Sequence, residues 1–389
     1  MIPLDAVVAE ILTCTAKTPL EPLISYVKLD TGSAYMFTLH PAAESLYLEI
    51  DGEYVSISAK TSTVGPGYHA FLISIMDSVQ AKLGLKWEWG ADDDEAGFAQ
   101  HRSFELLQSE MAKHLKSLAT IVSEQIAERG LTGMMLSMPV DCGIQTFENE
   151  ILTPVGPVAP AALRLWAGSE GPELMRAAIN YFPWWEAGLG GSFYRGLALH
   201  SIWTHMRWAR PLDDAERRDI ERTLAWCGEA ERLRADPPVP AAPVSELRAL
   251  LASPHDGEFP PETGIGYRRR QKLVELTGGW RLWVPGSLEE TLEDDNSTVV
   301  LWNDALIIRS SSVAARPKGE SAAMQAEESG IEIERKFVAA ADGNGFTLQV
   351  EANKRSAGIE RICVLTFWMA DASTRGRAEQ IAEALFHRE

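Results

Sequence analysis

The sequence predicts an α+β fold with an N-terminal antiparallel meander with helices, a helical middle region and a C-terminal antiparallel β-sandwich with a closing helix. Three observations lead to this prediction. The hydrophobic period is two residues near both ends of the chain and helical between residues 160 and 252. Clusters of proline and glycine stand where the period changes. With 389 residues, the chain is also longer than one hydrophobic core usually organises.

The first elements are a helix and four strands. Residues 4–14 carry apolar side chains at helical spacing and predict a short amphipathic helix. Four segments that alternate apolar and polar residues follow: ISYVKLD, AYMFTLH, SLYLEID and EYVSISA. Asp51-Gly52, between the last two, is a strong hairpin-turn signal. These segments predict an antiparallel meander.

Two helical patterns complete the N-terminal part. The first runs from Tyr68 to Leu83, and Gly84 stands where a C-terminal cap belongs. An acidic run over residues 92–95 precedes the second pattern, which ends at Gly130, and acids suit the positive end of a helix dipole. Together with the strands, these helices predict an α+β domain over residues 1–155.

Residues 156–253 predict a helical domain that is rich in tryptophan. The pattern from Leu189 to Arg207 is apolar around most of its circumference, as expected of a helix at the centre of a bundle. The proline-rich stretch ADPPVPAAPVSE is expected to cross the surface in an extended conformation. One more short helix ends at Leu251.

Residues 254–267 are a predicted linker, and residues 268–389 predict an antiparallel α+β sandwich. Paired strand-like runs flank Gly278-Gly279 and Asn303-Asp304, which are hairpin-turn signals. Three further strand-like runs follow. A helix from Thr374 to His387 closes the chain and is available to cover one sheet face.

The chain is strongly acidic, and its charge bears on the class of partner. It has 36 lysines and arginines against 55 aspartates and glutamates, a formal net charge of -19. Such a charge disfavours nucleic acid and anionic membrane as partners and attracts a basic protein. The start of the chain lacks the features of a signal peptide, and no long uncharged apolar run occurs. We therefore expect a cytoplasmic protein.

Sequence motifs for metal, cofactor or nucleophilic chemistry are missing. The four cysteines lie far apart with no CxxC pair, and no GxSxG motif occurs. His200 and His205 are five residues apart on one predicted helix, so they do not share a helix face. We expect no metal and no cofactor, and the only candidate catalytic residue is His69.

The stretch Gly65-Pro66-Gly67-Tyr68-His69 allows two interpretations. Free backbone N–H groups of Gly65, Gly67 and Tyr68 at a helix N-terminus, beside the His69 imidazole, would suit a carboxylate or phosphate. Glycine with proline is also typical of any sharp turn from a strand to a helix, and the stretch matches neither a P-loop nor a dinucleotide motif. We favour the structural turn and keep an anion site as the alternative.

Tryptophan usage allows two interpretations, a buried aromatic core and a binding surface. The chain has 12 tryptophans, and Trp184, Trp185 and Glu186 lie in a predicted loop between helices. Two adjacent aromatic residues in a loop do not easily both point inward, and exposed aromatic rings supply contact area at low entropic cost. We favour the interpretation that the tryptophans of this region form a core, and keep the binding surface as the alternative.

The run Arg268-Arg269-Arg270 is the one compact basic cluster. It suggests either an anion site or a hairpin edge protected by charge, and the second is the plainer interpretation.

These observations favour a non-enzymatic, cytoplasmic protein-binding factor of an immunity, accessory or regulatory type, with an acidic surface and an aromatic patch that meet a basic protein. One alternative is an enzyme with a dispersed active site around His69, which requires a cleft and a titratable partner for the imidazole. Another is a sensor of a small apolar ligand, which requires a pocket lined by Trp203 and its neighbours.

Overall fold

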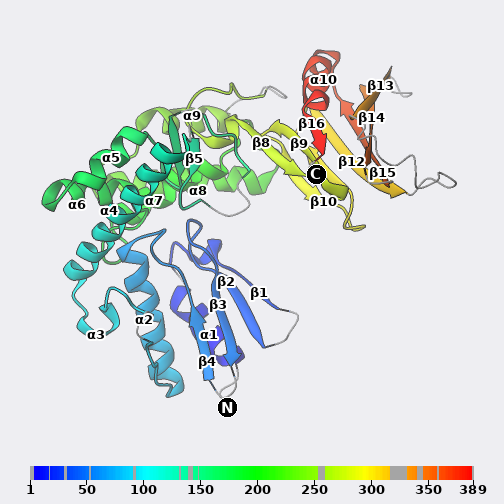
Figure 1. Ribbon diagram of the computed structural model, residues 1–389. Coiled ribbons are helices and arrows are strands. Elements are labelled where there is room, and N and C mark those ends of the chain that lie inside the picture. The colour runs from blue at the N-terminus through cyan, green and yellow to red at the C-terminus, as the bar shows by residue number, and fades with distance from the viewer. Residues whose placement is uncertain are drawn as a thin grey trace. The chain divides into compact units, whose positions relative to one another are not determined.

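The structure is a computed structural model that describes residues 4–16, 18–29, 33–51, 54–90, 93–130, 133–138, 143–147, 149–252, 259–315, 331–339, 345–356 and 359–387. The chain forms two compact units (Figure 1). Unit 1 comprises Met1–Asp141, Thr146–Thr204 and Arg222–Val244, and unit 2 comprises Cys142–Gln145, His205–Glu221 and Ser245–Glu389. The division into three domains and a linker stays a prediction.

Unit 1 begins with the predicted meander, drawn in blue in Figure 1. Its four strands pair antiparallel in the order β1-β2-β3-β4. Helix α1 contacts both β3 and α2. The bounds of these elements are α1 (Leu4–Thr15), β1 (Ser25–Lys28), β2 (Ala34–Thr38), β3 (Leu46–Asp51), β4 (Tyr54–Ser58) and α2 (Pro66–Leu83).

The rest of unit 1 is mainly helical, and the long helix α4 packs against α2, α5 and α6. A small sheet of order β5-β6-β7 precedes α5. The bounds are α3 (Phe98–His101), α4 (Phe104–Arg129), β5 (Gly133–Met135), β6 (Glu150–Thr153), β7 (Gly156–Val158), α5 (Pro160–Gly168), α6 (Gly171–Tyr181) and α7 (Gly191–His200). A π-helical turn, Ser201–His205, follows α7, and α8 (Asp214–Arg232) contributes its residues from Arg222 onward to unit 1.

Unit 2 is an antiparallel sandwich. A six-stranded sheet of order β10-β11-β12-β15-β14-β13 and a three-stranded sheet of order β16-β9-β8 enclose its core together with α10. The bounds are α9 (Ala241–Ala252), β8 (Gln271–Glu275), β9 (Trp280–Pro285), β10 (Glu289–Leu292), β11 (Val299–Trp302), β12 (Leu306–Ala315), β13 (Glu332–Ala339), β14 (Phe346–Ser356), β15 (Ile359–Met369), α10 (Arg375–Glu383) and β16 (Leu385–His387).

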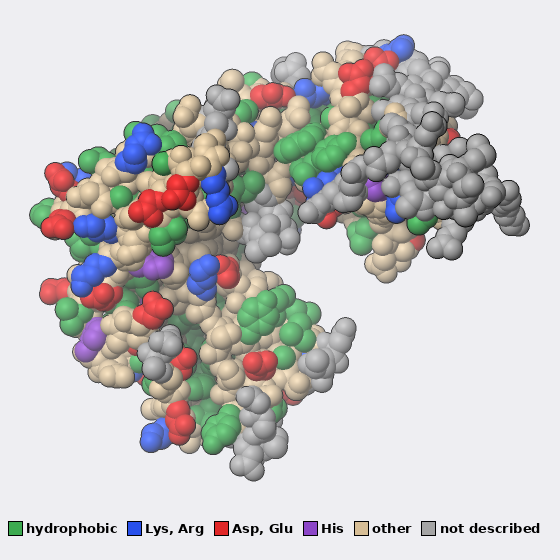
Figure 2. All heavy atoms as spheres, viewed as in Figure 1, with side chains coloured by type: hydrophobic (Ala, Val, Ile, Leu, Met, Phe, Trp, Pro, Cys, Tyr) green, Lys and Arg blue, Asp and Glu red, His purple; other side chains and the backbone are tan. Residues whose placement is uncertain are grey.

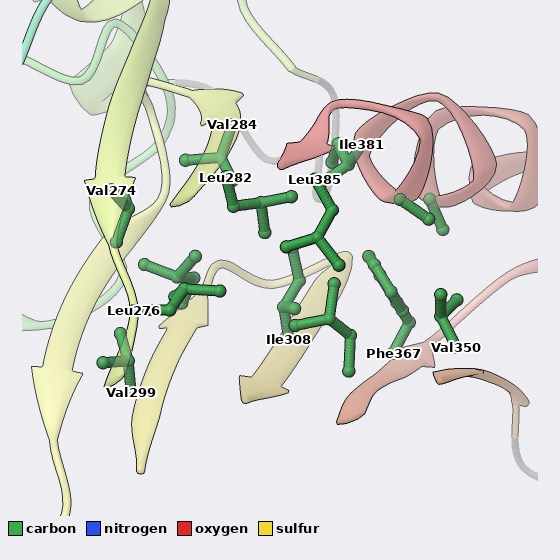
Figure 3. Packing of buried hydrophobic residues seen from close by; sticks show 14 of the residues in the cluster. Val274, Leu276, Leu282, Val284, Val299, Ile308, Val350, Phe367, Ile381 and Leu385 are labelled. Atoms are coloured by element: carbon green, nitrogen blue, oxygen red, sulfur yellow. The ribbon is translucent and has the colours of Figure 1, made fainter. Parts of the chain in front are cut away.

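The sandwich core explains why buried and exposed side chains alternate along the strands. Figure 3 shows Leu282 of β9, Ile308 of β12, Phe367 of β15 and Leu385 of β16 pointing toward one another. Along β15 the buried residues alternate with partly or fully exposed ones from Cys363 to Met369. One face of the six-stranded sheet is therefore core, and the other is not covered in the same way. The predicted α+β fold class is confirmed.

Three elements differ from the predictions. Helix α9 begins at Ala241, inside the proline-rich stretch that the sequence predicts to be extended. The long pattern that ends at Gly130 is interrupted, because Arg102 takes a left-handed conformation with φ of 56° and Ser103 caps a new helix, α4. The closing helix ends at Glu383, and the last three predicted helical residues form β16 instead. Strand β16 pairs antiparallel with β9 and buries Leu385 in the core. Among the described residues, no helix combines the length and apolar character needed to span a bilayer.

Candidate ligand-binding site

The glycine-rich turn at residues 65–69 packs against the loop with the candidate tryptophans, so the structure brings these two predicted sites together. The Gly67 N–H donates to the Trp184 carbonyl over 3.0 Å, and the Trp184 N–H donates to the Val64 carbonyl over 2.9 Å. A Cβ atom on Gly67 would lie 2.1 Å from Cδ1 of Trp184. Because the Gly67 N–H is already bonded, an anion at this helix N-terminus would have to displace Trp184.

The neighbouring glycine has a separate structural reason. Gly65 has a φ of 116°, a backbone conformation that glycine tolerates and that other residues avoid. A Cβ atom there would also lie 2.8 Å from the Trp184 carbonyl oxygen. Both glycines thus match the structural turn that the sequence favours, and an anion-binding role stays a prediction.

His69 has a titratable partner within reach. Its Nδ1 lies 3.0 Å from Oγ1 of Thr61, and its Nε2 lies 3.3 Å from Oδ1 of Asp94, although that second approach lacks hydrogen-bond geometry. Burial lowers the pKa of His69 below its ordinary value, and the Asp94 carboxylate opposes that shift. The His69 side chain is largely buried. Its ring meets the Phe98 ring edge to face, with 6.0 Å between the ring centroids. Through these contacts, His69 in the first turn of α2 connects the segment before α2 with the segment that leads into α3.

The two loop tryptophans are both buried. Trp184 is 1% exposed and Trp185 is 5% exposed. The expectation that adjacent aromatic residues in this loop would not both point inward is wrong, because each ring packs among aromatic neighbours of its own. Trp185 stacks on Phe182 with 5.9 Å between ring centroids. Trp184 packs in a separate ring cluster with His40, Tyr68, Phe71 and Phe193.

Glu186, the third member of that predicted binding patch, is exposed but has a local structural role. Its carboxylate accepts from the Ser192 N–H over 3.2 Å, and its own N–H donates to Oγ of Ser192 over 3.0 Å. This reciprocal pair satisfies a backbone donor in the first turn of α7. A role of Trp184, Trp185 and Glu186 in protein binding stays a prediction, but neither ring presents a surface to a partner.

A pocket of about 300 Å³ lies elsewhere, within unit 2. It is built by the segment before α8, the first turns of α8, the end of α9 and strands β10 and β11. Its apolar wall is formed by Met206, Trp208, Leu212, Ile220, Leu247, Leu250 and Trp302. Trp203 is not among its lining residues and packs against Gly156 in unit 1 instead. A ligand pocket lined by Trp203 stays a prediction.

Two arginines form part of the pocket wall, and the protein itself occupies their donors. Arg207 pairs with both carboxylate oxygens of Glu216 and donates to the carbonyls of Ser287 and Arg210 over 3.1 and 2.9 Å. The Arg207 side chain is only 4% exposed. An arginine held in this way supports the wall and has little capacity left for an anion.

Arg268, from the predicted basic cluster, is held similarly. It donates to the carbonyls of Gly286 and Leu288 over 2.8 and 3.1 Å and pairs with Glu289 over 2.7 Å. Burial lowers its pKa, and Glu289 opposes that shift. Arg268 thus holds the turn between β9 and β10 and the carboxylate of Glu289 in the pocket wall, and an anion-binding role of the cluster stays a prediction.

The charge balance of the lining is acidic. The lining includes the carboxylates of Asp213, Glu216, Asp219 and Glu289 and the guanidinium groups of Arg207 and Arg268. The site therefore favours a positively charged group, and its apolar wall favours a hydrocarbon portion next to that charge. Sequence reasoning missed this site because its residues come from four segments that are far apart in the chain, and only the arginine cluster was visible locally.

In the described part of the chain, no three histidine, cysteine or carboxylate side chains come together in an arrangement that could hold a metal ion. Comparison with known proteins places the chain in no family: no family model matches it, and no curated protein matches it.

Proposed function

We propose that the chain is a non-enzymatic binding protein whose pocket in unit 2 accepts a positively charged group joined to an apolar one, carried by a basic protein partner. The observation that carries this proposal is the acidic lining of the pocket, in which both arginines are already bonded within the protein. A cation entering the pocket meets a lining that carries four carboxylates and two arginines, whereas an anion meets arginines whose donors are mostly bonded within the protein.

The charge of the whole chain supports the same partner. A net charge of -19 attracts basic proteins over a longer range than the pocket does. On the face that Figure 2 shows, acidic side chains are interspersed with basic ones rather than gathered into one patch. We therefore propose that the pocket recognises the basic partner specifically, and that the remaining surface only attracts it by charge. Nucleic acid is not part of the proposal.

A reducing compartment fits this proposal. Cys14, Cys227 and Cys363 are free thiols, and the last two are buried. Free buried thiols are typical of cytoplasmic proteins, in which disulfides rarely persist. We accordingly propose a cytoplasmic, accessory or regulatory role in which binding itself is the activity.

A pair of small probes tests the pocket. Phenethylammonium and phenylacetate have similar aromatic bodies and opposite charges, and ¹⁹F NMR of fluorotryptophan-labelled protein reports on Trp208 and Trp302 once their signals are assigned with phenylalanine variants. We expect phenethylammonium to shift both signals and phenylacetate to leave them in place. Equal shifts with both probes, or shifts with neither, contradict the proposal.

A matched pair of variants tests the charge. Asp219 lines the pocket, whereas Glu221 lies two residues further along α8 and does not. We expect Asp219→Asn to weaken phenethylammonium binding by roughly fivefold, the effect of removing one nearby charge in a partly solvated site. Glu221→Gln removes the same charge from the chain and should leave the affinity unchanged. Equal losses in the two variants would show that the general charge, not the pocket, binds the probe.

A further inference from the structure

An apolar strip leads from the pocket across the outer face of the six-stranded sheet, which is the face opposite the core. Trp302 of β11 lies directly opposite Ile307 of β12, and Ile307 lies opposite Trp368 of β15. Trp302 also lines the pocket. The three side chains therefore form a cross-strand row that begins in the pocket, and we call Trp302, Ile307 and Trp368 the apolar strip.

The strip faces away from the sandwich core. The sequence neighbours Leu301, Ile308 and Phe367 are each at most 1% exposed and belong to the core. Because successive side chains in a strand point to opposite faces, the strip residues point outward. Ile307 is 41% exposed and Trp368 is 40% exposed. Large apolar side chains in a continuous exposed row are typical of an interaction surface.

The row has a defined length and a polar end. Neighbouring strands are about 4.8 Å apart, so three strands place the outer residues of the row about 10 Å apart. That distance corresponds to about three residues of an extended chain, at about 3.3 Å per residue. Beyond Trp368 the next residue in the row is Thr347 of β14. A segment that lies along the strip thus meets apolar side chains over a few residues and then a hydroxyl group.

We propose that the pocket and the apolar strip together bind an extended segment of a basic protein, with a lysine or arginine side chain in the pocket and apolar side chains on the strip. This inference rests on the proposed function of the pocket and adds the form of its ligand. Charge complementarity selects the occupant, since the pocket lining has more carboxylates than arginines and a second copy of this chain brings a net charge of -19. The long stems of lysine and arginine suit the pocket's apolar wall, because they bury hydrocarbon beside a charged end.

Peptide binding tests the inference. The probe is a fluorescein-labelled peptide with one lysine followed by leucine and valine, and fluorescence anisotropy gives its affinity. In one comparison peptide norleucine replaces lysine, and in the other serines replace the apolar residues. We expect each replacement to weaken binding at least tenfold. If the serine peptide binds as well as the parent peptide, the strip plays no part and the inference fails.

Variants of residues on the outer sheet face provide a second test of the inference. Ile307→Thr combined with Trp368→Thr removes the strip beyond the pocket and keeps good strand formers. Val313→Thr is the matched control, because Val313 lies on β12, has the same strand parity as Ile307 and is 64% exposed. We expect the double variant to bind the peptide at least tenfold more weakly, and the control to bind it like wild type.

The two proposals fail in different ways. If phenethylammonium binds wild type and peptide affinity does not change in the double variant, the extended-segment inference is wrong and the pocket function stands. If neither probe binds wild type, both are wrong. Because aromatic rows also bind sugars, cellohexaose serves as a competing probe: strip-dependent binding of the sugar, without lysine-dependent binding of the peptide, would overturn the inference in favour of a carbohydrate.

Discussion

At the scale of single residues, burial without a counter-charge decides the chemistry of His40. This side chain is 0% exposed and packs among Tyr68, Trp184 and Phe193. Its Nδ1 accepts the Ala42 N–H over 3.1 Å, while its Nε2 has no hydrogen-bond partner in the described part of the chain. Burial lowers the pKa of His40 to about 3, because the imidazolium would have to exist without solvent.

This histidine makes unfolding sensitive to acid. In the unfolded chain its pKa returns to about 6.5, so between that pH and about 3 the unfolded state binds one more proton than the folded state. The stabilisation is complete above pH 6.5 and is lost as the pH falls toward 3, at up to about 1.4 kcal/mol per pH unit. We expect His40→Asn, which keeps an acceptor for Ala42, to show a smaller loss of unfolding free energy with acid than wild type.

The measurement is urea denaturation of both proteins at a series of pH values from 7 to 4. Equal slopes of unfolding free energy against pH in wild type and variant would contradict the assignment. NMR of the wild-type imidazole gives an independent check, since His40 should stay neutral throughout this range.

The wall of the pocket contains a buried ion pair whose two members differ in exposure. The Arg207 side chain is 4% exposed and that of Glu216 is 24% exposed. Glu216→Gln leaves the arginine charge in place and removes its main counter-charge, so we expect a loss of about 3 kcal/mol in unfolding free energy. Arg207→Met combined with Glu216→Gln removes the charge as well and should recover part of that loss. Calorimetric or urea unfolding of the three proteins checks this, and an unaltered Glu216→Gln protein would contradict it.

At the scale of elements, two helical glycines predict opposite results. Gly196 lies inside α7, and a Cβ atom there would lie 1.8 Å from the backbone oxygen of Pro183. Gly228 lies inside α8, and a Cβ atom there would meet nothing within 4 Å. We expect Gly196→Ala to cost about 3 kcal/mol because backbone has to move, and Gly228→Ala to stabilise by about 0.5–1 kcal/mol.

The denaturant midpoints of the two variants, measured beside that of wild type, show whether Gly196→Ala is destabilised and Gly228→Ala is stabilised. Each variant is the control of the other, because both introduce the same methyl group into a helix. A stabilised Gly196→Ala protein would mean that α7 does not approach Pro183 as closely as the structure has it.

Local hydrophobic patterns predict helices and strands well where one face of the element packs on the core. They predict them poorly where pairing with a strand distant in the sequence determines the structure. The alternation along β15 is visible in the sequence because one face of this strand is core. The residues of β16 continue the helical pattern of α10, and only their pairing with β9, about a hundred residues earlier, makes them a strand. For the same reason, local sequence could not reveal that Trp184 and Trp185 are both buried, each among different aromatic neighbours.

At the scale of the whole molecule, discontinuity limits what the sequence shows. Unit 2 draws on His205–Glu221 as well as on the chain from Ser245 onward. Its pocket needs side chains from both segments, so no spacing or short motif contains the site. The net charge, in contrast, can be counted from the sequence without knowing the fold. The acidic charge that suggests a basic partner is a property of the whole chain.

That charge predicts how a basic ligand reaches the pocket. A net charge of -19 attracts a cationic peptide before contact, and salt screens this attraction once the Debye length falls to about 10 Å near 0.1 M. We expect the association rate constant of the lysine peptide to fall roughly tenfold between about 20 and 200 mM sodium chloride. The dissociation rate constant should change by less than about threefold, because it depends on contacts in the pocket and on the apolar strip.

Stopped-flow anisotropy separates the two rate constants, and sucrose at the same osmolality controls for effects of the solute that are not ionic. The peptide that keeps its lysine but has serine flanks should show the same salt dependence of association with a faster dissociation, since it is steered by the same charge and held by fewer contacts. An association rate constant that does not respond to salt would mean that the acidic excess of the chain is not what brings a basic partner to unit 2. The pocket would then act through short-range contact alone, and neutral ligands with the same hydrocarbon portion should associate with it as fast as cationic ones.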